Sequence, residues 1–113
     1  MSFVRARDHA RRAAPKVVFC DRCAELVRFR EHAAAFLRFD VDGLLVEACV
    51  THVACAASRA RHVDPAETAE IISAREIDAD QRSRLRGLAR AAHPGASISR
   101  ILQKVSRLSR GSP

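Results

Sequence analysis

Two short pairs of metal-ligating residues constrain this chain more than any other feature. Cys20-x2-Cys23 and Cys49-x2-His52 each place two soft ligands three positions apart, and 25 residues separate the pairs. A structural Zn²⁺ takes four Cys or His side chains in a tetrahedron. The paired motif is also much more specific than a single Cys-x2-Cys. We therefore expect a zinc site formed by Cys20, Cys23, Cys49 and His52.

Cys55 leaves the ligand set open, because it follows His52 by three residues and can replace either His52 or Cys49. A buried thiol is the other common state of a free cysteine. Four thiolates at Cys20, Cys23, Cys49 and Cys55 would also suit an iron–sulfur cluster. Redox chemistry at the first pair is a weaker alternative, since redox Cys-x2-Cys motifs start a helix and a hairpin is expected here.

The size of the chain makes a metal a natural support for the fold. A chain of 113 residues allows one compact domain or two very small ones, and lobes of about 50 residues usually need a metal, disulfides or a partner. Bulky aromatic residues are few and are concentrated near the first cysteine pair: Phe19, Phe29, Phe36 and Phe39. We expect the metal to supplement this limited core.

The region around the cysteines reads as a hairpin followed by a helix. Asp42-Gly43 separates the apolar runs 36–41 and 44–48, which is a strong hairpin signal because Gly tolerates a positive φ. The Ala-rich segment 50–62 predicts a helix with Val50, Val53, Ala54 and Ala57 on one face.

Residues 16–62 resemble the treble-clef class of zinc fingers in this order of ligand knuckle, hairpin and helix. The resemblance implies that Cys20, Cys23, Cys49 and His52 are the four ligands, with the second pair on the first helical turn. It covers less than half of the chain and implies a scaffold rather than an activity, because one fold serves many functions.

Three further helices are expected in the second half. Asp64-Pro65 with Glu67 resembles a capping box and predicts a helix over 65–76. Asp80 is placed to cap a helix that ends near residue 92, before Pro94-Gly95. Ser97 is placed to cap a last, strongly amphipathic helix whose apolar residues recur at helical spacing: Ile98, Ile101, Leu102, Val105 and Leu108.

The charge is unevenly distributed, with a net charge of +7 for the chain as a whole. Segment 64–80 has six acids and only Arg75 to balance them, whereas segment 81–113 has eight cations and no acid. The first 15 residues are rich in Arg, lack apolar periodicity and predict a flexible basic arm. A basic segment of this kind favours a polyanionic partner such as nucleic acid.

The last two helices have the lengths and the break of a helix-turn-helix pair, and with 65–76 they would form a three-helix bundle. Their outward residue types suit phosphates and base edges. The expected nucleic-acid-binding residues are Arg82, Arg86, Arg90, Ser99, Arg100, Gln103, Lys104 and Arg107.

The expected fold is α+β, with a basic arm at 1–15, a zinc-stabilised treble-clef-like lobe at 16–62 and a helical, helix-turn-helix-like lobe at 64–110. The expected function is nucleic-acid binding, with DNA favoured over RNA, as a small transcriptional or phage or mobile-element regulator. The alternative is an accessory subunit that docks on RNA polymerase or the ribosome through segment 64–80 or the last helix. A zinc-linked thiol sensor with Cys55 as the spare thiol is a third hypothesis.

Catalysis is not expected, because all four metal positions are filled and no phosphate loop or nucleophile motif is present. No small-molecule substrate is therefore expected. The sequence has no membrane-length apolar run and no signal-peptide core, which favours a cytoplasmic location and no membrane partner.

Overall fold

The computed structural model describes residues 18–90 and 98–108, and within them the chain is a mixed α+β protein with two small sheets and three α-helices. In chain order, the elements are β1 (Val18–Phe19), β2 (Leu26–Val27), η1 (Arg30–His32), β3 (Ala33–Phe39), β4 (Leu45–His52), α2 (Val53–Ala60), β5 (Thr68–Ser73), η2 (Ala74–Glu76), α3 (Ala79–Arg90) and α4 (Ile98–Arg107). The two short turns of 3-10 helix, η1 and η2, precede β3 and α3.

The predicted hairpin is confirmed and is longer than expected. β3 and β4 pair antiparallel from Ala33 opposite His52 to Phe39 opposite Leu45. The turn between them has Gly43 at φ +85°, a conformation that favours glycine, and the Asp40 carboxylate accepts hydrogen bonds from the backbone N–H groups of the turn.

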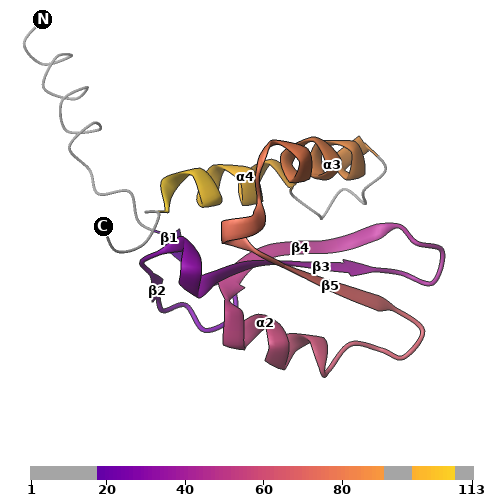
Figure 1. Ribbon diagram of the computed structural model, residues 1–113. Coiled ribbons are helices and arrows are strands. Elements are labelled where there is room, and N and C mark those ends of the chain that lie inside the picture. The colour runs from indigo at the N-terminus through magenta and orange to yellow at the C-terminus, as the bar shows by residue number, and fades with distance from the viewer. Residues whose placement is uncertain (1–17, 91–97, 109–113) are drawn as a thin grey trace, which may run out of the picture.

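The three-stranded sheet, in the order β4-β3-β5, lies between two helical layers (Figure 1). Helices α3 and α4 cover one face, where Leu37 and Val50 belong to the same buried cluster as Leu85 and Ile101. Helix α2 covers the other face, where Phe36 and other sheet residues pack with Ala56. β1 and β2 pair with each other at one end of the molecule.

The prediction of a helix at 65–76 is wrong, and so is the prediction of a three-helix bundle that included it. Residues Thr68–Ser73 form β5, which pairs antiparallel with β3. Asp64 begins a turn instead of a helix: its carboxylate accepts a hydrogen bond from Ala66 N–H at 2.9 Å. The β-branched residues of this segment suit a strand, and pairing with β3 outweighs the local helix signal.

The helix predicted at 50–62 exists but begins three residues later and buries a different face. Val50 is a buried residue of β4, and α2 starts at Val53, which is exposed. Ala54 and Ala57 are exposed too, and Ala56 is the buried residue of the helix. The strand therefore extends through His52, a difference that decides the metal site.

The last two predicted helices are confirmed within the described residues. α4 buries Ile98, Ile101 and Val105 at the predicted helical spacing, and Leu108, directly after the helix, is buried as well. α3 is capped by Asp78 rather than Asp80, since the Asp78 carboxylate accepts from Gln81 N–H at 2.9 Å. The connection at 91–97 and the basic arm at 1–15 lie outside the described residues.

Candidate metal centre

The first cysteine pair lies in a tight turn between β1 and β2. The Cys20 sulfur accepts three hydrogen bonds of 3.4 Å, from the backbone N–H groups of Arg22, Cys23 and His52. Ala24 N–H also closes the turn on the Cys20 carbonyl at 2.9 Å, with Ala24 itself at φ +67°. Because N–H donors stabilise a thiolate, this turn prepares Cys20 to bind a cation.

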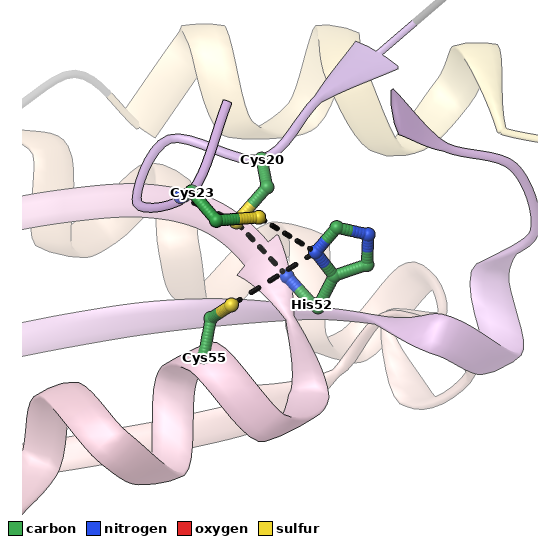
Figure 2. Close-up of side chains that lie close together, drawn as sticks. All are labelled: Cys20, Cys23, His52 and Cys55. Carbon is green, nitrogen blue, oxygen red and sulfur yellow. Dashed lines mark hydrogen bonds between the residues drawn. The ribbon is translucent and has the colours of Figure 1, made fainter. Parts of the chain in front are cut away.

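Four side chains from three parts of the chain converge in front of this turn (Figure 2). The ligand atoms of Cys20, Cys23, His52 and Cys55 all lie within 4.8 Å of one another. His52 Nδ1 is 3.4 Å from Cys23 Sγ and 3.9 Å from Cys55 Sγ. Ligands about 2.0–2.3 Å from a tetrahedral Zn²⁺ would be about 3.5–3.8 Å apart. The cluster therefore has the size and the donor set to bind a metal ion.

The orientation of His52 selects one ring nitrogen as the ligand. His52 Nε2 lies 2.9 Å from the Leu26 carbonyl oxygen, which can only accept a hydrogen bond. Nε2 must therefore carry the proton and donate it, which leaves the Nδ1 lone pair directed at the sulfurs. A backbone carbonyl that fixes the tautomer is the usual outer partner of a metal-binding histidine.

Burial raises the pKa of both Cys20 and Cys55, but the other groups around the two thiols act in opposite directions. Burial raises the pKa of Cys20, but the backbone N–H groups of Cys23, His52 and Arg22 lower it more, to about 6. The pKa of Cys55 is raised to about 11 by burial and by its hydrogen bonds and charge interactions with Cys20 and Cys23. Several thiolates crowded together need a cation to balance their charge, which agrees with a metal site.

Cys49, the fourth ligand expected from the sequence, is not among these four residues. Residues three apart on a strand point to opposite faces, and both Cys49 and His52 belong to β4. Cys49 instead packs with Phe36 on the face covered by α2 and lines an open cleft of about 260 Å³. Burial, with the nearby charges of Glu47, Asp21 and Cys20, raises its pKa to about 12.

The cluster thus has a Cys₃His donor set in which Cys55, the alternative ligand, takes the position expected for Cys49. The iron–sulfur hypothesis required Cys49 together with Cys55, and the cluster does not contain Cys49. None of the four cysteines forms a disulfide.

The residues expected to bind nucleic acid lie on α3 and α4 and differ in their surroundings. Arg86, Arg90, Ser99, Arg100, Gln103 and Arg107 are exposed, and Arg82 is half-buried. Lys104 forms an ion pair with Asp21 of the cysteine turn at 2.7 Å, which the sequence did not suggest. Arg84, on the same helix as Arg82, donates two hydrogen bonds to Glu70 of β5.

Sequence reasoning missed the role of Asp21. Its carboxylate accepts from Val50 N–H at 2.9 Å, and its own N–H donates to the Val50 carbonyl. These bonds attach the cysteine turn to the edge of β4. An Asp inside a Cys-x2-Cys motif is the only local signal for this contact, and it does not identify the partner strand.

No known protein family, curated protein or solved structure matches this chain significantly. In the part of the chain described here, no helix is long and apolar enough to cross a membrane.

Proposed function

We propose that Cys20, Cys23, His52 and Cys55 hold a structural Zn²⁺. The proposal is supported by the 4.8 Å cluster of three sulfurs and one correctly oriented imidazole, a donor set typical of structural zinc. In this arrangement one ligand pair comes from the cysteine turn, and the other joins His52 at the end of β4 to Cys55 in the first turn of α2. This order resembles the treble-clef class with its second pair shifted by three residues. With all four positions filled by protein, the metal supports the fold and is not a site of catalysis.

Elemental analysis of the purified protein tests this proposal, with one zinc per chain as the expected result. A coloured protein that contains iron would contradict it.

We further propose that this zinc protein binds nucleic acid, with DNA favoured, through the layer formed by α3 and α4. The supporting observation is the arrangement of its cations. Arg82, Arg86 and Arg90 follow one row of α3, and Arg100, Lys104 and Arg107 follow one row of α4. Among the described residues, only Lys104 in these rows has an ion pair. Rows of arginine on packed helices suit phosphates, with affinity supplied by counterion release.

Binding to a labelled duplex and to the corresponding single strand, titrated with salt, tests this function. We expect micromolar affinity near 50 mM salt that weakens steeply as salt rises. Replacing Arg86 and Arg90, or Arg100 and Arg107, with Ala should reduce the salt slope by about one per lost phosphate contact. The matched control, R28A/R61A, removes the same charge from exposed positions outside the two rows. Absence of binding at low salt, or an equal loss in the control, would contradict the proposal.

The second candidate function is docking on a large assembly such as RNA polymerase or the ribosome. The apolar side of α4 is buried in the chain's own core, so this candidate depends on segment 64–80 instead. The observation that favours it is β5, an edge strand of the sheet on which Ile71 is 41% exposed. A defined protein retained in a nuclease-treated pull-down, and lost in the variant Ile71→Lys, would support docking over direct nucleic-acid binding.

A further inference from the structure

Asp21 connects three parts of the molecule that are far apart in the sequence. It lies between the two cysteines of the turn, directly after Cys20. One carboxylate oxygen accepts from Val50 N–H at 2.9 Å, and the other accepts from Lys104 Nζ at 2.7 Å. This single side chain therefore touches the proposed metal turn, the edge of β4 and helix α4.

The contact between Asp21 and Lys104 of α4 is partly shielded from solvent. Lys104 is 19% exposed and Asp21 is 32% exposed, so the pair is partly shielded from water, where ion pairs are stronger than on the open surface. A second bond attaches the same end of the molecule's last helix elsewhere, because Arg30 Nε, in η1, donates to the Leu108 carbonyl just after α4. The end of α4 is therefore attached both to the cysteine turn and to η1.

We infer that Asp21 is a positioning residue that couples metal binding to the docking of α4 through its ion pair with Lys104. The inference rests on the proposed metal site. When the metal fixes Cys20 and Cys23, the turn between them has one conformation, and Asp21 faces both Val50 and Lys104. Without the metal, the turn is held only by its own hydrogen bonds, so Asp21 is fixed less firmly in the position in which it meets Lys104.

Coupling of this kind is reciprocal. If metal binding forms the Asp21–Lys104 pair, the pair must in turn strengthen metal binding by the same free energy. Lys104 lies in the same helical row as Arg100 and Arg107. The metal would thereby fix the position of the basic row on α4, although none of the metal ligands lies on α3 or α4.

The experiment measures Zn²⁺ affinity of the full chain by competition with a chromophoric chelator. Lys104→Met removes the charge on α4 and keeps the apolar stem, and Asp21→Asn keeps an oxygen for Val50 N–H while removing the charge. Each should weaken Zn²⁺ binding by about fivefold, the scale of a partly shielded ion pair. The matched control, Arg107→Met, changes an exposed cation of the same helix and should leave the affinity unchanged.

The double variant D21N/K104M distinguishes coupling from general destabilisation. If the two residues act through one ion pair, the double variant binds Zn²⁺ about as tightly as either single variant. An unchanged affinity in K104M, fully additive losses, or an equal loss in R107M would each overturn the inference. If the wild-type chain itself binds no Zn²⁺, the proposed metal site fails, and with it the coupling that rests on it. Zn²⁺ binding that is indifferent to Lys104 refutes the coupling alone.

Discussion

At the scale of single residues, the junction between β4 and α2 determines the ligand set. The strand ends at His52 and the helix begins at Val53, so Cys55 lies in the first helical turn. This change of backbone conformation turns the Cys55 thiol toward the same point as His52 Nδ1, at 3.9 Å (Figure 2). Cys49, inside the strand, points to the opposite face.

The first prediction tests, by substitution, whether Cys55 or Cys49 is the metal ligand. Cys55→Ser should weaken Zn²⁺ binding by at least about 100-fold, because loss of a ligand exceeds the effect of losing an outer-shell partner. Cys49→Ser is the matched control and should bind Zn²⁺ with the affinity of the wild type. Its folding stability should fall moderately, because Cys49 packs against Phe36. Chelator competition on both variants provides the measurement. A larger loss of affinity in the Cys49 variant would return that residue to the ligand set.

A second prediction concerns Ala24, which lies at φ +67° directly after Cys23. This left-handed conformation costs a residue with a Cβ about 1–2 kcal/mol, and glycine adopts it freely. Ala24→Gly should therefore stabilise the zinc-loaded protein by about 0.5–1 kcal/mol, after the extra entropy of glycine in the unfolded chain is subtracted. Denaturant unfolding measures the change. Ala57→Gly, at an exposed site inside α2, should instead destabilise by about 1 kcal/mol.

At the scale of elements, the sequence correctly predicted those turns and helices whose formation depends on residues close by in the chain. The Asp42-Gly43 turn, the apolar row of α4 and the cysteine turn depend on nearby residues, and the structure contains all three. β5 was missed because its pairing with β3, about 30 to 40 positions earlier, has no local signal. The same limit explains the ligand error, since the end of β4 is set by its pairing with Ala33 and not by the Ala-rich sequence that follows.

A third prediction concerns the ion pairs that attach α2 to the sheet. Glu47 of β4 accepts hydrogen bonds from Arg38 at 2.7 Å and Arg59 at 2.8 Å, and Arg38 also contacts Glu67 at 2.6 Å. Burial raises the pKa of Glu47, but the hydrogen bonds from Arg38 and Arg59 outweigh it and lower the pKa below 4.5. This carboxylate therefore stabilises the fold above about pH 4.5, and the contribution disappears as the pH falls through the lower folded pKa.

Glu47→Gln should destabilise the protein by about 1–3 kcal/mol at pH 7, the range for a hydrogen bond to a charged group. It should also flatten the decrease in stability on acidification, which urea unfolding at pH 7 and at pH 4 would measure. The control Glu25→Gln, at an exposed position, should keep both the stability and the pH dependence of the wild type. An unchanged acid response in E47Q would mean that Glu47 does not contribute to it.

At the scale of the whole molecule, one buried cluster joins the two lobes that the sequence suggested at 16–62 and 64–110. It includes Val18 of β1 and Leu37 of β3 together with Leu85 of α3 and Ile101 of α4. Helices α3 and α4 therefore pack directly on the sheet that ends at the metal cluster. Elements that share one core usually unfold together.

The last prediction follows from this shared core: the chain should unfold in one cooperative transition that depends on zinc throughout. At free Zn²⁺ about 1,000 times its Kd, binding stabilises the folded state by about 4 kcal/mol. For a domain of about 100 residues that corresponds to a rise in Tm of about 15 °C or more. Calorimetry with Zn²⁺ and with a chelator would measure it, and hydrogen exchange would follow β3 and α4 separately. Two independent lobes would instead give two transitions, with the one that contains α3 and α4 unaffected by the chelator.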